Sequence, residues 1–201
     1  ILMLSDHALS TSGVGTQSRF LINGLIDTGK YTFRQFGAAQ KHTDYKVTKV
    51  NEDFIIKPTD GFGTPEMLRL ALATEKPDLV LIFTDPRFFH WLFSMEDEIH
   101  QVCPIAYWHV WDNKPYPEFN DMYYEATDLL ACHSHHTYEQ LVEKWPDKTY
   151  FVPHTVPSEV YFEFTEEEKA QAKQKWLPNK QDWFTGLSLI HISEPTRHHA
   201  I

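Results

Sequence analysis

Short apolar runs alternate along this 201-residue chain with longer stretches of helical periodicity. That alternation is typical of a parallel β-sheet covered by helices, because each helix carries the chain back to the start of the next strand. Six such runs suit one sheet and predict a Rossmann-like, doubly wound α/β domain. The runs are residues 1–5, 31–36, 79–83, 105–110, 129–132 and 150–152.

The segments between the runs carry signals for the ends of helices. Residues 16–25 place apolar side chains on one helical face, and Gly29 is suited to ending that helix. Thr64 and Asp85 each precede a proline, as the N-cap residue of a helix often does. Between residues 40 and 63 the pattern changes, and the sequence predicts a β-hairpin insertion there.

Composition limits the class of protein. Hydrophobic residues make up 42% and aromatic residues 14%, as in a folded globular domain, and no apolar run approaches the ~20 residues that span a bilayer. The formal net charge of −10 disfavours nucleic acid as the main partner, because phosphate contacts need clustered Lys and Arg. Cys103 and Cys132 each stand beside a predicted buried strand, so we expect the reduced thiols of a cytoplasmic protein.

The end of the sequence differs in character from the rest. Residues 187–197 read LSLIHISEPTR, which resembles the translation of a transposase-adapter sequence used in preparing DNA sequencing libraries. We therefore expect the native sequence to stop near Gly186. The chain also opens at Ile1 inside an apolar run, so we expect it to be an internal piece of a longer protein.

This division predicts three regions. Residues 1–162 form the first domain, residues 163–186 form an interdomain helix with the start of a further domain, and residues 187–201 are an artefactual tail. Thr165 and Glu168 form a capping box, which predicts that the interdomain helix begins there and runs to Trp176.

A glycine-containing segment links the first predicted strand to the first predicted helix. In open α/β sheets ligands bind beyond the carboxyl ends of strands, and glycines let the backbone approach a phosphate at a helix N-terminus. The segment therefore indicates a diphosphate-bearing ligand, and the alternative is a tight turn that binds nothing. Its residues are Ser12, Gly13, Val14, Gly15, Thr16 and Gln17.

A bound nucleotide cofactor is disfavoured at this segment. Ser18 stands where a dinucleotide-binding motif has its third glycine, and the second predicted strand ends without an acidic residue for a ribose. A Walker-type loop is excluded, because no Gly-Lys-Ser/Thr follows.

The strand at residues 103–112 delivers an aromatic and polar cluster to the same edge of the sheet. Aromatic rings offer apolar faces to a sugar, whereas His and Asp side chains hydrogen-bond hydroxyl groups or transfer protons. The pattern is consistent with carbohydrate chemistry, and the alternative is a packed aromatic cluster with a satisfied histidine. The cluster comprises Trp108, His109, Trp111 and Asp112.

Two further residues are expected at this edge. Asp85 follows the strand at residues 79–83 and should act first as a helix cap and second as a ligand-binding group. Ser134 is predicted to be the N-cap of a helix at residues 135–145. Cys132 and three nearby histidines are crowded together, but neighbouring residues rarely converge on one ion, so we expect no metal site.

The chain resembles the N-terminal domain of glycosyltransferase family 4, the retaining enzymes of the GT-B fold. Three segments carry the resemblance: SGVGTQ at residues 12–17, YWHVWD at residues 107–112 and YFVPHTVPSEVYF at residues 150–162. The first is similar to the family's glycine-rich loop, and the second to its His-Asp pair. The third has Thr155 where glycine is usual and Pro157 where aspartate is usual.

The resemblance implies a glycosyltransferase that moves a sugar from a nucleotide-diphosphate donor to a hydroxyl acceptor with retention of configuration. It implies front-side attack without an essential metal, with the nucleotide sugar as co-substrate and no bound cofactor; it assigns no membrane contact. Residues 12–17 would face the donor diphosphate and the acceptor. The catalytic pair would be His109 and Asp112, and the acceptor cleft would contain Trp108, Trp111, Asp85 and Ser134.

The family's second domain supplies the cations and paired glutamates that hold the donor. We therefore expect residues 1–186 alone to be inactive. Two alternatives come from other classes of protein. One is a non-catalytic carbohydrate-binding module with Trp108 and Trp111 as its platform, and the other is a nucleotide-binding oxidoreductase.

Overall fold

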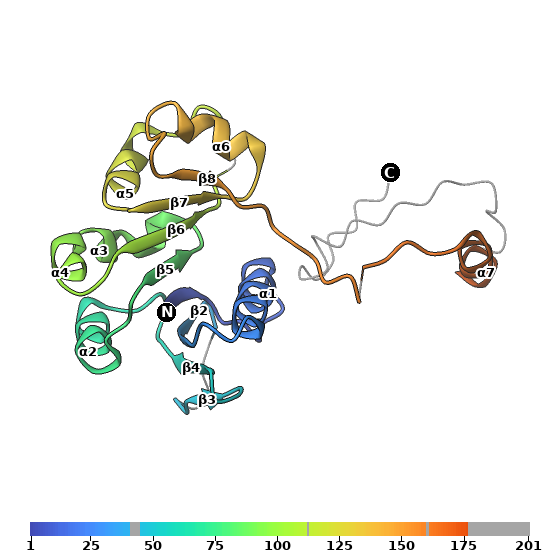
Figure 1. Cartoon of the computed structure of the whole chain (residues 1–201), viewed down its shortest axis with the longest axis horizontal. Helices are drawn as coiled ribbons and strands as arrows, with labels where there is room; N and C mark the ends of the chain where they lie inside the picture. Colours follow the sequence, from blue (N-terminus) through green and yellow to red (C-terminus); the bar gives the residue numbers. More distant parts are fainter. Residues whose placement is uncertain (41–44, 112, 160, 177–201) are drawn as a thin grey trace. The chain divides into compact units, whose positions relative to one another are not determined.

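The computed structural model describes residues 1–40, 45–111, 113–159 and 161–176, and within them eight strands form one sheet (Figure 1). The strand order is β3-β4-β2-β1-β5-β6-β7-β8, and all neighbours are parallel except β3 and β4. The fold is therefore α/β and Rossmann-like, as the sequence predicts. The strands are β1 (Leu2–Asp6), β2 (Phe33–Ala38), β3 (Thr48–Lys49), β4 (Phe54–Pro58), β5 (Val80–Phe83), β6 (Ile105–His109), β7 (Leu129–Cys132) and β8 (Thr149–Phe151).

Helices cover both faces of this sheet. In the described part of the first 155 residues, α1 packs on one face and α2 to α6 pack on the other (Figure 1). The helices are α1 (Gly13–Asp27), α2 (Pro65–Glu75), α3 (His90–Phe93), α4 (Glu96–His100), α5 (Asp121–Glu125), α6 (His135–Val142) and α7 (Glu166–Trp176), with two 3₁₀ turns, η1 (Pro86–Phe89) and η2 (Glu118–Asn120).

The central strands send alternate side chains into two hydrophobic cores. Leu4 of β1 and Tyr107 of β6 belong to the core beneath α2 to α6, whereas Met3 and Trp108 belong to the core beneath α1. Because both faces of a parallel sheet are buried, its strands appear in the sequence as continuous apolar runs. All six predicted runs form strands.

The predicted hairpin between residues 40 and 63 is present, and it also extends the sheet. Its strands β3 and β4 are antiparallel, with Lys49 opposite Ile55. Strand β4 pairs in parallel with β2, with Phe33 opposite Phe54. Since Phe54 and Ile56 are buried in the core beneath α1, hydrophobic burial holds the hairpin in register with the sheet.

Two predicted helix ends are displaced in the structure. Helix α1 begins at Gly13, earlier than Thr16, because Ser12 caps it. Helix α6 ends at Val142, before the predicted Trp145. The cap residues Thr64, Asp85 and Ser134 take the predicted positions, and Gly29 follows the end of α1 with a φ of +71°.

The chain divides into two compact units, Ile1–Thr155 and Val156–Ile201. The sequence predicts that the first domain ends at residue 162. In the second unit, α7 opens with the predicted capping box, in which the Glu168 carboxylate accepts from the Thr165 backbone N–H at 2.8 Å. The adapter-like stretch lies outside the described residues. No helix in the described part is long and apolar enough to cross a membrane.

Candidate functional site

The order of strands in the sheet reverses at β1, which lies between β2 and β5. In open α/β sheets, ligands bind beyond the carboxyl ends of the strands at such a reversal. The predicted site residues lie along this carboxyl edge. Residues 12–17 follow β1, Asp85 follows β5, residues 108–111 lie at the end of β6 and Ser134 follows β7. Asp112 lies outside the described residues.

Helix α1 starts at the edge of the sheet with an ordered cap. The Ser12 hydroxyl accepts from the Gly15 backbone N–H at 2.9 Å and donates to Asp6 Oδ2 at 2.8 Å. The first backbone N–H groups of a helix have no acceptor within it, and the helix dipole makes this end partially positive. The amides of Gly13 and Val14 therefore begin a 15-residue helix as hydrogen-bond donors.

The two glycines of this segment differ in what the fold demands of them. A Cβ on Gly15 would lie 2.4 Å from Ser10 Oγ and 2.5 Å from the His7 carbonyl oxygen. A Cβ on Gly13 would meet no atom within 4 Å, and neither glycine has a positive φ. Packing therefore requires glycine at position 15 and does not require it at the exposed position 13.

Asp6, the last residue of β1, is a site residue that sequence reasoning missed. Its side chain is 9% exposed and lies beside the start of α1 through its hydrogen bond with Ser12. Burial raises the pKa of the Asp6 carboxyl, and the hydrogen bond from Ser12 opposes that rise.

Gln35 of β2 hydrogen-bonds the loop that follows β1, and sequence reasoning did not predict this role. Its side-chain amide accepts from the Ala8 backbone N–H at 3.1 Å and donates to Ser5 Oγ at 2.7 Å and to the Asp6 carbonyl at 2.9 Å. Ser18 of α1 donates to the same Ser5 hydroxyl at 3.0 Å. Because these polar groups are buried and paired, they fix the backbone that leads into α1.

The other side chains of residues 12–17 mostly contact other parts of the protein. Val14 packs against the core beneath α1. The Gln17 amide makes two hydrogen bonds to the Thr155 backbone, donating to its carbonyl at 2.9 Å and accepting from its N–H at 3.3 Å. The Thr16 backbone N–H donates to the Ser12 carbonyl at 2.9 Å. A ligand at residues 12–17 would therefore meet mainly the backbone amides of Gly13 and Val14, and few free side-chain groups.

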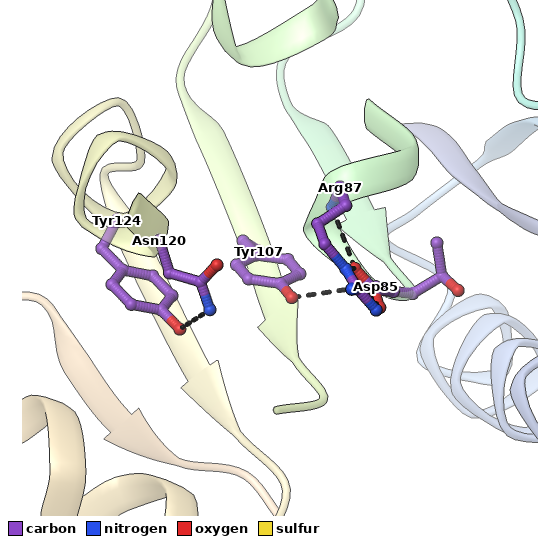
Figure 2. A network of polar contacts seen from close by, with 6 residues as sticks. Asp85, Arg87, Tyr107, Asn120 and Tyr124 are labelled. Atoms are coloured by element: carbon purple, nitrogen blue, oxygen red, sulfur yellow. Dashed lines mark hydrogen bonds and ion pairs between the residues drawn. The ribbon is translucent and has the colours of Figure 1, made fainter. Parts of the chain in front are cut away.

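His109 ends β6 with its imidazole fully buried. Its Nε2 lies 2.7 Å from the Tyr124 hydroxyl. Asn120 Nδ2 donates to that same hydroxyl at 3.2 Å (Figure 2). Burial, together with the charge of His133, lowers the pKa of His109 to about 3. The ring is therefore neutral near pH 7, and its Nδ1 is buried without a hydrogen-bond partner.

The two tryptophans near His109 are buried rather than open. Trp108 is 3% exposed, points into the core beneath α1 and donates from its indole N–H to the Val152 carbonyl at 2.9 Å. Trp111 is 9% exposed, and its indole nitrogen is buried without a partner. Neither ring presents a free face at the surface. Phe119, which packs edge-on against Trp111, is about half exposed.

Asp85 acts as the predicted cap and also forms an ion pair. Its carboxylate accepts from the Arg87 backbone N–H at 2.9 Å and binds the Arg87 guanidinium (Figure 2). That guanidinium lies 5.1 Å from the centre of the Trp111 ring. Burial opposes ionisation of Asp85, but the hydrogen bonds and charge of Arg87 outweigh it and lower its pKa. Beside this pair, Tyr107 donates to the Thr84 carbonyl at 3.1 Å.

Ser134 caps α6, so its hydroxyl accepts from the Thr137 backbone N–H at 3.2 Å. His133 donates from Nδ1 to the His109 carbonyl at 2.7 Å and stacks on His154. Partial burial, with the charge of His133, lowers the pKa of His154 to about 4. Across the described residues there is no group of three or more His, Cys, Asp or Glu side chains arranged to hold a metal ion.

The carboxyl edge thus combines an open helix start at Gly13, a carboxyl group on Asp6 and a buried, neutral imidazole on His109. These groups can bind an anion and hydrogen-bond an uncharged polar group. Comparison with models of protein families gives no match, and comparison with curated proteins gives none either.

Proposed function

We propose that this chain is the acceptor-side domain of a retaining glycosyltransferase that uses a nucleotide-diphosphate sugar. One observation carries the proposal. The carboxyl edge of the sheet pairs a helix-start glycine that the fold does not need, Gly13, with a buried histidine nitrogen that has no partner, Nδ1 of His109. The first group suits a diphosphate, and the second suits a sugar oxygen.

The diphosphate is assigned to the start of α1 because of its backbone amides. Glycine is a poorer helix former than alanine, so an exposed glycine in the first turn of a helix needs some other reason. Gly13 is exposed, has no positive φ and has free space around its Cβ position. Close approach of a phosphate to the backbone would explain why this position has glycine, which lacks a Cβ.

The sugar is assigned to His109 because its ring lacks a partner. A buried polar group without a hydrogen bond costs about 1–3 kcal/mol. Contact with Nδ1 requires the surrounding side chains to move apart, and a sugar oxygen would then supply the missing hydrogen bond. In this proposal His109 orients the sugar, and the amides of Gly13 and Val14 stabilise negative charge on the leaving diphosphate.

The two alternatives from other classes receive less support. A carbohydrate platform needs open aromatic faces, whereas Trp108 and Trp111 are buried. A dinucleotide-dependent oxidoreductase needs an acid after the second strand of the fold, and β2 ends at Ala38 with Ala39 next.

The test is a titration of the chain with inorganic pyrophosphate, UDP-glucose and GDP-mannose, followed by backbone-amide NMR. The amides of Gly13 and Val14 should shift with all three. Gly13→Ala adds a methyl group on the approach side without a clash, and should weaken binding at least about five-fold, or ~1 kcal/mol.

Gly24→Ala is the matched control. It also replaces a helical glycine of α1 with free space at its Cβ position, far along the helix from Gly13, and should leave binding unchanged. Equal binding by Gly13→Ala and the unaltered chain would contradict the assignment of the diphosphate. Shifts from NAD that exceed those from the nucleotide sugars would favour the oxidoreductase.

A further inference from the structure

We infer that Tyr124 and Asn120 are positioning residues that hold His109 as a neutral hydrogen-bond donor, with its proton on Nδ1, for an uncharged oxygen of the ligand. The tautomer follows from the contacts of these three side chains. That the oxygen belongs to a sugar rests on the proposed function. In this role His109 takes no part in proton transfer.

The tautomer follows from the orientation of the Asn120 amide. The amide presents Nδ2 to the Tyr124 hydroxyl oxygen at 3.2 Å, so that oxygen acts as an acceptor, and the amide's Oδ1 is buried without a hydrogen-bond partner (Figure 2). The hydroxyl has one proton, and within the described chain the acceptor that lies within its reach is His109 Nε2, at 2.7 Å. A nitrogen that accepts cannot carry a proton, so the neutral ring has its proton on Nδ1.

The surroundings of the three residues keep this arrangement neutral. His109, Asn120 and Tyr124 are each fully buried. Burial also raises the pKa of Tyr124, so its hydroxyl stays protonated. The His109 ring packs edge-on against Tyr107, 5.6 Å between ring centres, and against Tyr124, 5.1 Å. The ring is therefore fixed by packing as well as by its hydrogen bond.

The free groups define the chemistry of the ligand. A buried Nδ1–H without a partner can only donate, so the atom it receives must be an acceptor. The neutral Nδ1–H group of His109 does not attract a cation. It also cannot accept a proton from a reacting hydroxyl. A hydroxyl or ether oxygen of a sugar meets these requirements.

The experiment is ¹⁵N NMR of the imidazole rings in the whole chain, which distinguishes protonated from unprotonated ring nitrogens. In the unaltered chain, the His109 Nδ1 should show a protonated shift and Nε2 an unprotonated one. Tyr124→Phe should abolish this pattern and give a ring protonated mainly on Nε2. Asn120→Ala should give a mixture, because the Tyr124 proton is then free to turn away.

Tyr116→Phe is the matched control. Tyr116 packs on the same Tyr124 ring, 5.3 Å between centres, but its hydroxyl donates to Asp121 and not to His109. Tyr116→Phe should leave the His109 shifts unchanged. The comparison separates loss of the Tyr124 hydroxyl from a general disturbance of packing around the Tyr124 ring. A His109 ring protonated on Nε2 in the unaltered chain would overturn the inference, as would an unchanged ring in Tyr124→Phe.

Addition of UDP-glucose and GDP-mannose to the same samples separates this inference from the proposed function. A shift of the His109 Nδ1 proton that Tyr124→Phe abolishes supports both. If the tautomer is as inferred and neither compound moves that proton, the assignment of a sugar fails while the roles of Tyr124 and Asn120 stand.

Discussion

Acid should destabilise this protein through the burial of His109. The pKa of that imidazole is about 3 in the folded chain, against about 6.5 in an unfolded one. Between these values the unfolded chain binds the extra proton, so the free energy of unfolding falls as the pH decreases from about 6.5 toward 3. Above about pH 6.5 the ring is neutral in both states, and His109 adds no pH dependence.

The size of the effect follows from the shift. One such group gives a slope of about 1.4 kcal/mol per pH unit, and the full shift has a ceiling of about 5 kcal/mol. That ceiling is comparable with the whole stability of a small domain, about 5–15 kcal/mol. His109 is fully buried, so solvent does not screen this contribution.

The assay is urea unfolding followed by tryptophan fluorescence between about pH 7.5 and about pH 4.5. His109→Gln keeps a side-chain group that can accept from Tyr124 but does not titrate. Its slope between about pH 6 and pH 4.5 should be smaller than that of the unaltered chain by about 1 kcal/mol per pH unit. His135→Gln, at the exposed start of α6, is the control and should keep the full slope. Parallel loss of stability in His109→Gln and the unaltered chain would refute the reasoning.

Three further predictions concern the loop and helix at the carboxyl edge. Gly15→Ala should lower the free energy of unfolding by ~1–3 kcal/mol because of its two close contacts, whereas Gly24→Ala should raise it by up to ~1 kcal/mol; equal effects in urea unfolding would contradict the clash. Gln17→Ala should speed hydrogen exchange of the Thr155 amide about five-fold, since it removes a bond worth ~1 kcal/mol, and unchanged exchange would argue against that tether. Gln35→Met should destabilise the chain by ~1–3 kcal/mol, as it leaves the buried Ala8 N–H unpaired, and a thermal midpoint equal to that of the unaltered chain would disprove this role.

Local signals predicted the strands and most helix caps. A strand buried on both faces needs an uninterrupted apolar run, and the core residues Leu2, Met3 and Leu4 of β1 form one. Cap signals are equally local, because the side chain at Ser134 bonds the backbone three residues on. The start of α1 was misplaced for a related reason. Its first turn contains Gly13 and Gly15, and glycine does not indicate a helix in the sequence, so the N-cap at Ser12 was not recognised.

The partners of the site residues were not predictable in this way. Tyr124 meets His109 across 15 positions of sequence, and Gln35 meets Ala8 across 27. Such contacts depend on which strands are neighbours and on which face a helix packs. Trp108 and His109, which the sequence placed together in one cluster at the edge of the sheet, are both buried in the fold.

The sequence by itself determined the fold class and the edge of the sheet where its polar residues gather. Both depend on periodicity and on the order of elements, and the carboxyl ends of parallel strands share one edge whatever packs around them. Only the tertiary structure decided that Gly15 serves packing while Gly13 stays open, and that His109 is neutral with a free nitrogen. These properties depend on distances and desolvation between distant segments, which no local pattern in the chain specifies.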